Sequence, residues 1–127
     1  MKAALIDTSS ILFALRYRKD LFERLGEQFP DCKPVISRGV VGELKAMGAN
    51  RGKRGALARL ALMMLKSKKV EIHNIGIDPD RWIQRQAARS RGRMVVTNDS
   101  ELARKASAIG ARCFKVSRSG SIKRYLW

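Results

Sequence analysis

Two aspartates, near opposite ends of the chain, each follow an apolar segment and stand beside hydroxyl or amide side chains. Asp7 comes directly after the apolar residues 3–6 and precedes three hydroxyl residues, and Asp99 follows residues 94–96 with a threonine and an asparagine between. A buried carboxylate costs free energy unless a cation or hydrogen-bond donors meet it. If both segments are strands of one parallel sheet, both acids emerge at its carboxyl edge, where open α/β sheets bind ligands. We therefore expect this edge to hold divalent metal.

Two further acids are candidates for the same site. Glu43 lies three residues after Val40 and four before Met47, so it shares the apolar face of a predicted helix, where an ion pair with a nearby lysine or arginine is the alternative. Asp78 precedes a proline and is the expected N-cap of the next helix, which places Asp80 in the first turn, pointing inward. Favourable placement near the positive helix end is the alternative for Asp80, and Asp78 is its rival.

Helix capping is the competing explanation for the two strand-end aspartates. Asn98 with Glu101 three residues later forms a capping box, which would leave Asp99 free. Ser9 or Ser10 can cap the first helix in the same way, which would leave Asp7 free. Clustered carboxylates repel one another, and Mg²⁺ or Mn²⁺ is the usual counter-charge because hard cations prefer oxygen ligands.

The hydrophobic pattern predicts an α/β fold with the element order β-α-α-β-α-α-β-α-β-α-β, in which a central parallel sheet of about five strands is covered by helices on both faces. The expected strands are 3–6, 34–37, 70–75, 94–97 and 111–116, and the expected helices begin near residues 9, 21, 39, 56, 79 and 100. Residues 48–55 are expected to be a mobile basic loop, and 118–127 a basic C-terminal tail. We expect residues 1–127 to form one domain.

The charge of the chain points to a polyanionic partner. Lys and Arg number 27 against 11 Asp and Glu, which gives a formal net charge of +16, and nucleic acid is the leading candidate. A solvated basic surface is the alternative. The residues expected to follow an RNA backbone are Arg51, Lys53, Arg54, Arg89, Arg91, Arg93, Arg118, Lys123 and Arg124.

The remaining polar and aromatic residues give weaker indications. Tyr125 and Trp127 could stack on unpaired bases, although packing of Trp127 on the core is the stronger expectation. The only histidine, His73, falls on a predicted strand and is expected to be structural. The two distant cysteines, the lack of a signal peptide and the short apolar runs favour a reducing, cytoplasmic location without membrane contact.

The chain resembles the PIN domain family. The resemblance lies in residues 5–9 (LIDTS), 40–44 (VVGEL), 80–83 (DRWI) and 95–102 (VVTNDSEL). It implies a three-layer α/β/α fold, metal-dependent RNA endonuclease activity, and metal ligation by Asp7, Glu43, Asp80 and Asp99, with Thr8 and Asn98 as supporting polar groups.

Within that family, residues 113–119 and 121–122 resemble the small-subunit rRNA-processing nucleases more than the VapC toxins of toxin–antitoxin pairs. Two features depart from the processing nucleases. Asp80-Arg81 stands where they often have a doubled aspartate, and the chain has no zinc ribbon of the kind that some of them carry.

The working hypothesis is hydrolysis of single-stranded RNA, with an rRNA precursor as the candidate substrate and one or two Mg²⁺ or Mn²⁺ ions at the acids. The alternatives are a PIN-fold RNA-binding protein with little turnover, a VapC-type toxin ribonuclease inhibited by an antitoxin, and a structure-specific DNA nuclease. A homodimer or a ribosome-assembly factor as protein partner is left open.

Overall fold

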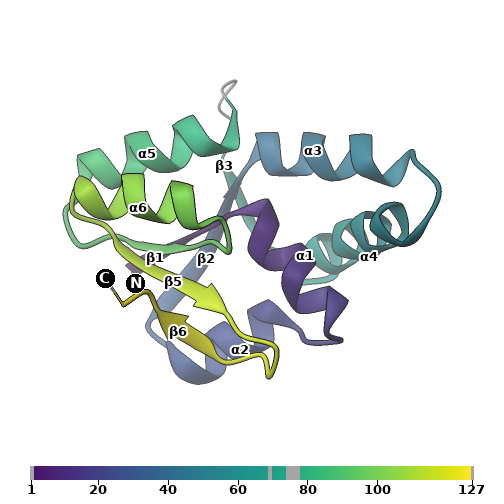
Figure 1. The fold of residues 1–127 in the computed structure, drawn as a ribbon, viewed down its shortest axis with the longest axis horizontal. Coiled ribbons are helices and arrows are strands. Elements are labelled where there is room, and N and C mark those ends of the chain that lie inside the picture. The colour runs from purple at the N-terminus through teal and green to yellow at the C-terminus, as the bar shows by residue number, and fades with distance from the viewer. Residues whose placement is uncertain (1, 69, 74–77, 127) are drawn as a thin grey trace.

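The computed structural model describes residues 2–68, 70–73 and 78–126. Within these ranges a mixed six-stranded sheet, mostly parallel, has the strand order β3-β2-β1-β4-β5-β6 (Figure 1). Strands β1 to β5 run parallel to one another and β6 is antiparallel. The strands are β1 Lys2–Ile6, β2 Cys32–Ser37, β3 Glu71–His73, β4 Met94–Val96, β5 Arg112–Val116 and β6 Ile122–Arg124.

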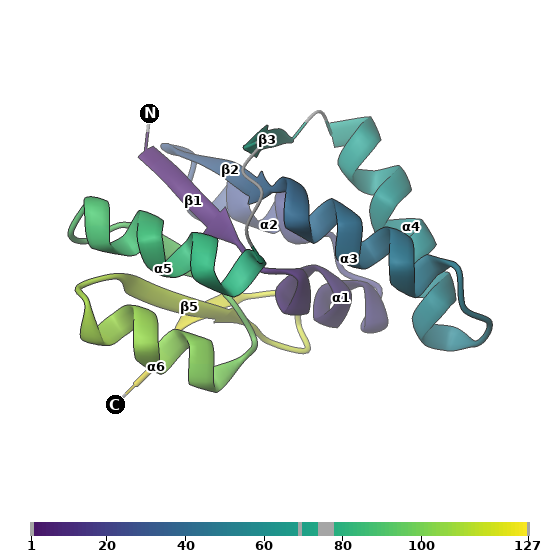
Figure 2. The same ribbon diagram turned by 90° about the horizontal axis from the view of Figure 1, so that it is seen from above.

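Helices lie against both faces of this sheet, so the predicted three-layer α/β/α architecture is confirmed. They are α1 Thr8–Arg16, α2 Leu21–Gln28, α3 Arg38–Gly48, α4 Lys53–Lys68, α5 Pro79–Arg89 and α6 Ser100–Ala108. Figure 2 shows α5 and α6 together on one side, and α3, α4 and α1 on the other. No helix in the described part of the chain is long and apolar enough to cross a membrane.

Alternation along β1 divides the core into two layers. Ala4 and Ile6 pack with the apolar residues of α1 to α4, whereas Leu5, which points to the opposite face, packs with those of α5 and α6. The side chains of a strand point to opposite faces in turn, so five residues of one strand serve both layers. Burial of both faces explains why β1 and β4 are continuous apolar segments.

The order in which strands are added to the sheet reverses between β1 and β4, which are themselves parallel. The strands β1, β2 and β3 extend to one side of this point, and β4, β5 and β6 to the other. The register aligns Leu5 with Val95 and Ile6 with Val96, so both strands end at the same edge. A crevice at such a switch point is where open α/β sheets bind ligands.

The C-terminal segment corrects one sequence prediction. Residues 122–124, predicted to lie in a basic tail, form β6 against β5, with Val116 opposite Ile122. Gly120 has a φ of 90°, which only glycine adopts without strain, and it allows the return turn. Ile122, the only apolar residue of β6, is buried, and one apolar side chain between basic ones gives no strand pattern.

The predicted basic loop 48–55 is also shorter in the structure. Helix α3 continues to Gly48, and α4 already begins at Lys53 instead of residue 56. Gly55 was part of the loop prediction, yet it lies buried in the helix, where a Cβ would collide with the Asn50 carbonyl. The glycine therefore serves close packing rather than a turn.

Candidate active site

Asp7, the residue after β1, is buried at the switch point with a fixed carboxylate. It is 5% exposed, and its Oδ2 atom accepts hydrogen bonds from Ser9 Oγ (2.5 Å) and from Thr97 Oγ1 (2.8 Å). The expected capping role of Ser9 or Ser10 is wrong, because α1 begins earlier, at Thr8. Ser10 Oγ instead donates to the Val96 carbonyl at 2.7 Å. Both hydroxyls therefore join α1 to the neighbouring strand.

The same hydroxyls connect the two strand ends to each other. Ser9 Oγ accepts the Asn98 backbone N–H at 3.0 Å, and Thr97 Oγ1 accepts the Asp99 N–H at 3.1 Å. Ser9 and Thr97 are site residues that the sequence reasoning did not assign to the acids. The available signal was their place within two residues of Asp7 and Asp99. The network holds the turns after β1 and β4 in one arrangement.

Asn98 has a supporting role at the neighbouring strand. Its Nδ2 group donates to the Val116 carbonyl at 2.9 Å, and its Oδ1 accepts the Val116 N–H at 3.0 Å. Both ends of the amide are therefore used by the end of β5. This is why Asn98 is not the cap of α6.

Asp99 is itself the N-cap of α6, which corrects the expectation that it would be free of capping. Its Oδ1 accepts the backbone N–H groups of Glu101 (3.0 Å) and Leu102 (3.2 Å). Capping uses one carboxylate oxygen, Oδ1, for both of these hydrogen bonds. Oδ2 is the oxygen that remains for a cation.

Glu43 approaches the site from α3. Its side chain is exposed rather than part of the apolar face, because Val40 and Leu44 take the buried positions of this helix. Partial removal from water raises the pKa of the Glu43 carboxyl, and the charges of Asp7, Asp80 and Asp78 raise it further, while the Thr8 hydroxyl lowers it. Glu43 therefore lies within the electrostatic field of the other acids.

Asp80 approaches from the first turn of α5 and is likewise exposed instead of pointing inward. Partial burial raises the pKa of its carboxyl, as do the charges of Asp7, Asp99 and Asp78, and Lys105 lowers it. Asp78 is the N-cap of α5, as predicted, and its Oδ1 accepts the Arg81 N–H at 3.0 Å. Unlike Asp99, Asp78 has a partner at each carboxylate oxygen, because Arg81 Nε lies 4.0 Å from its Oδ2. This favours Asp80 as the third acid.

The donor set of this cluster fits a hard divalent cation. Carboxylates are the ligands that Mg²⁺ prefers, and the mutual repulsion just described is what bound positive charge would relieve. The buried Thr8 hydroxyl, next to Asp7, faces the Glu43 carboxylate and lowers its pKa. Within the described residues, however, no three His, Cys, Asp or Glu side chains are already placed to hold an ion together.

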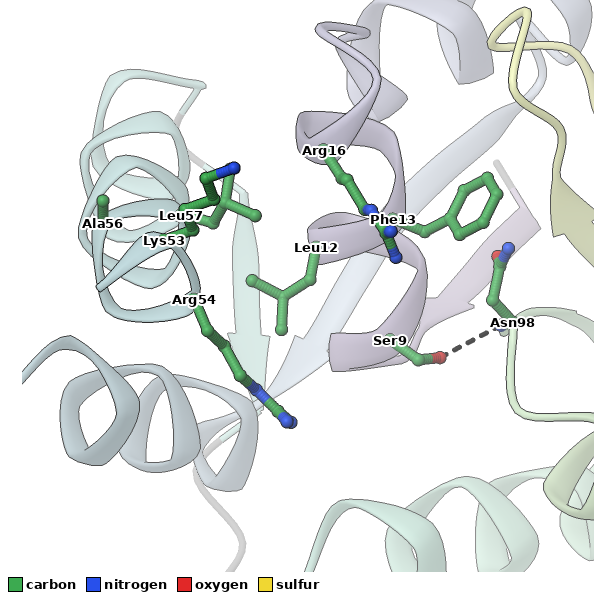
Figure 3. Close-up of a pocket in the computed structure, with 9 residues that line it drawn as sticks. All are labelled: Ser9, Leu12, Phe13, Arg16, Lys53, Arg54, Ala56, Leu57 and Asn98. Atoms are coloured by element: carbon green, nitrogen blue, oxygen red, sulfur yellow. Dashed lines mark hydrogen bonds between the residues drawn. The ribbon is translucent and has the colours of Figure 1, made fainter. Parts of the chain in front are cut away.

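A groove lies beside this cluster, between α1 and α4 (Figure 3). Its volume is about 910 Å³, and the apolar part of its lining comes from Leu12, Phe13 and Leu57. Ser9 and Asn98 line the groove as well, and their hydrogen bond is the dashed line in Figure 3. None of the four acids lines the groove, but Ser9, which does, donates a hydrogen bond to Asp7, so the groove ends one side chain away from this acid.

The basic residues expected to contact RNA divide between the two edges of the sheet. Lys53 and Arg54, in the first turn of α4, line the groove, and Arg51 is exposed just before them. Arg118 follows β5 and lies 5.8 Å from the ring of Tyr17 at the end of α1. Lys123 and Arg124 are exposed on β6, where Arg124 lies near Cys113 in the amino half of β5 and so away from the acids.

The other group is far from the acids. Arg89 ends α5, and Arg91 and Arg93 immediately precede β4. Met94 pairs with Ala4 near the start of β1, so these three arginines stand at the amino edge of the sheet. The structure does not bring them together with Asp7 and Asp99, and it gives Arg93 a structural partner, Gln86 Oε1 at 3.1 Å.

The aromatic and histidine expectations have mixed outcomes. Tyr125 is half-buried, and its hydroxyl donates to the Thr97 carbonyl at 2.8 Å, so it braces the turn before Asp99. Burial, and then the charges of Asp99, Cys113 and Asp7, raise the pKa of Tyr125 to about 12. His73 packs edge-on against Trp82 with ring centroids 5.8 Å apart, which fits a structural role. Trp127 lies outside the described residues.

A family model described as "PIN like domain" matches residues 4–118. The chain belongs to the PIN-like domain family. The resemblance noted in the sequence is thereby confirmed. No curated protein matches the chain.

Two solved structures have the same PIN-like fold. The PIN domain endonuclease Utp24 matches with a TM-score of 0.78 and 28% identity, over 98% of this chain and 92% of the Utp24 chain. A domain of a functionally unknown protein from Methanocaldococcus jannaschii DSM 2661 matches with a TM-score of 0.58 and 20% identity, over 92% of each chain. PIN domains are generally nucleases, so this chain has a nuclease fold.

Proposed function

We propose that this PIN-like domain is an Mg²⁺- or Mn²⁺-dependent endoribonuclease that hydrolyses single-stranded RNA. The observation that carries the proposal is that Asp7 and Asp99 follow the paired strands β1 and β4 at the switch point of the sheet. Glu43 and Asp80 are near enough for the charge of Asp7 to raise the pKa of each. In a chain of net charge +16, acids gathered at one crevice favour a cation site within a surface that attracts nucleic acid.

The four carboxylates would hold the cation. When bound, Mg²⁺ or Mn²⁺ supplies Lewis-acid chemistry, because it neutralises phosphate charge and lowers the pKa of water. Ser9 and Thr97 orient the Asp7 carboxylate by binding one oxygen, Oδ2, which leaves the other oxygen for the site. Asp99 is oriented by its own helix, and Thr8 supplies a buried hydroxyl beside Glu43.

The groove beside the cluster supports RNA as the substrate. Arg16, Lys53 and Arg54 line it, and phosphate contacts of this kind position a nucleic acid without reading its sequence. A strand that follows these cations passes directly to Ser9 and so to Asp7. We also propose an rRNA precursor as the substrate, on the resemblance of residues 113–119 to rRNA-processing PIN nucleases.

The proposal is tested with a labelled single-stranded RNA, Mn²⁺ or Mg²⁺, and four Asp→Asn variants. Each variant keeps the size of the side chain and removes one negative charge. We expect cleavage that EDTA abolishes and that Asp7→Asn and Asp80→Asn each reduce by more than the roughly 10- to 100-fold typical of outer-shell losses. Asp78→Asn should retain activity because asparagine also caps helices. Asp31→Asn, exposed at the amino edge before β2, is the matched control.

Two results would refute the proposed endoribonuclease activity. Equal cleavage by the wild type and by Asp7→Asn would mean that the activity comes from a contaminant or another site. RNA binding without metal-dependent cleavage would instead favour the RNA-binding alternative. An rRNA precursor cleaved no more selectively than an unrelated transcript would remove the second part of the proposal.

A further inference from the structure

The groove between α1 and α4 combines two kinds of surface that a simple phosphate track does not need. One part is apolar, formed by Leu12, Phe13 and Leu57, and the other is cationic, formed by side chains of α1 and α4. In Figure 3, Leu12 lies between Leu57 and Ser9, and the Arg54 side chain extends along the open side of the groove. Phosphates gain nothing from apolar contact, so the apolar part requires another occupant.

The aromatic ring of the groove is held in place. Phe13 packs against Tyr17 with ring centroids 4.9 Å apart. The guanidinium groups of Arg16 and Arg118 lie 5.7 Å and 5.8 Å from the Tyr17 ring. Such a cluster of rings and guanidinium groups, beside a cationic surface, is typical of proteins that stack unpaired bases.

The volume of the groove and the charge of its lining limit which ligands can bind there. The volume of about 910 Å³ falls within the roughly 300–1,000 Å³ of small-molecule sites, and the lining carries three cations and no acid. A nucleotide has both an apolar base face and an anionic phosphate. A base within an RNA duplex is stacked and paired, so only an unpaired base can enter.

We infer that this groove is a binding subsite for one unpaired nucleobase of the RNA, next to the scissile phosphate. The base lies against Leu12 and Leu57, and its phosphates contact Arg16, Lys53 and Arg54. Phe13, whose ring extends to the other side of α1 in Figure 3, lines the end of the subsite toward Asn98. Ser9 marks the end of the subsite at the acid cluster. The inference rests on the proposed RNA substrate and adds a structural requirement, since cleavage would need an unpaired nucleotide beside the cut.

The test separates the base from the backbone. A short fluorescein-labelled RNA and an abasic ribose-phosphate strand of equal length carry the same charge, and their affinities are measured by fluorescence anisotropy in EDTA. We expect the intact RNA to bind at least about fivefold more tightly, since stacking of one base accounts for that much or more. The ratio of the two affinities is the readout.

Ala56→Glu and Leu57→Ala test whether this ratio comes from the groove. Ala56 lines the groove at an exposed position, and both variants should bring the ratio close to one. Met63→Glu is the matched control, because Met63 is 69% exposed two turns farther along α4 and does not line the groove. It should preserve the ratio, and circular dichroism would verify that all variants fold.

The outcomes separate this inference from the proposed function. A ratio near one in the wild type, or a ratio that Ala56→Glu and Met63→Glu change equally, would overturn the base subsite, even if the wild type cleaves RNA with Mn²⁺. A ratio that only the groove variants abolish would support the subsite, even if no cleavage is found. If both groove variants kept the ratio of the wild type, the apolar part of the groove would not bind a base, and the inference would be overturned.

Discussion

At the scale of single residues, Thr97 links the two acids that the sheet brings together. Its hydroxyl donates to Asp7 Oδ2 at 2.8 Å and accepts the Asp99 N–H at 3.1 Å, and the residue is fully buried. The Ser9 hydroxyl also bonds to both strand ends, through Asp7 and the Asn98 N–H. The hydroxyl of Thr97, rather than the size of its side chain, should therefore determine how the two carboxylates are oriented.

We predict that Thr97→Val lowers metal-dependent cleavage by about 10- to 100-fold, the usual effect of losing an outer-shell partner. Valine keeps the volume of threonine but removes the hydroxyl, which leaves the Asp99 N–H without its acceptor. Asp99 is exposed, so water can reach its N–H, whereas the hydrogen bond from Thr97 to Asp7 is buried. Loss of that bond should cost about 0.5–1.5 kcal/mol, and urea unfolding should show this loss of stability.

Thr97→Ser is the control for that prediction. Serine keeps the hydroxyl, so most of the activity should return despite the small cavity. If Thr97→Val and Thr97→Ser had the same activity, the orientation of Asp7 by this hydroxyl would be refuted.

The raised pKa of Asp80 gives a prediction for stability and pH. The pKa of Asp80 in the folded protein lies above 3.8, so ionisation of its carboxyl opposes folding. The stabilising contribution of the protonated carboxyl is present below pH 3.8 and is lost as the pH rises through the folded-state pKa. In EDTA at neutral pH, Asp80→Asn should therefore have a higher melting temperature than the wild type. This difference in melting temperature should vanish as the pH falls below 3.8.

Mn²⁺ should reverse that order, because it stabilises the protein that binds it better. Thermal unfolding of both proteins, with Mn²⁺ and with EDTA, measures the effect, and Asp31→Asn is the control outside the cluster. If Asp80→Asn were less stable than the wild type in EDTA at neutral pH, partial burial and the neighbouring acids would not raise the pKa of Asp80.

At the scale of elements, α6 depends on the same residue as the proposed chemistry. Asp99 caps this helix through Oδ1, so a simple loss of activity in one variant would not separate the two roles. Asparagine caps as well as aspartate, and alanine does not cap.

We predict that Asp99→Asn folds with nearly wild-type stability but loses cleavage, whereas Asp99→Ala loses cleavage and about 0.5–2 kcal/mol of stability. Chemical denaturation and an RNA cleavage assay on both variants measure the two effects separately. Full activity of Asp99→Asn would assign Asp99 to capping alone.

The elements also show what the sequence can and cannot predict. The apolar segments before Asp7 and Asp99 predict two strands of one parallel sheet, and this prediction is confirmed, because burial on both faces leaves a clear pattern. That the two strands are neighbours comes from the structure alone. The positions of Glu43 and Asp80 at the rim were not predictable, since a rotation of each helix by a fraction of a turn decides between burial and exposure. The contact of Tyr125 with Thr97 depends on β6, whose one buried residue leaves almost no periodic signal.

At the scale of the whole molecule, the net charge of +16 predicts salt-dependent binding. The charge alone suggested that all nine basic candidates could contact RNA. The fold separates them, because Arg54 lies in the groove beside the acids and Arg89 lies at the opposite edge of the sheet. Composition predicts the class of partner but not the face that binds it.

We predict that the affinity for single-stranded RNA falls steeply with salt and that Arg54→Gln reduces the slope of log K against log salt by about 0.7, the contribution of one phosphate contact. Arg89→Gln, which removes the same charge, should leave the slope unchanged. Fluorescence anisotropy over a salt series measures both slopes. Equal reductions in the two variants would mean that RNA is attracted by net charge without a defined path.

The central claim is that folding brings Asp7, Glu43, Asp80 and Asp99 together as a site for a divalent cation. The most direct test is a crystal structure of the protein soaked with Mn²⁺, in which anomalous scattering locates the metal. We expect Mn²⁺ coordinated by oxygens of these carboxylates at the ends of β1 and β4. Well-ordered carboxylates with no anomalous signal between them, or with Mn²⁺ bound only elsewhere, would contradict it.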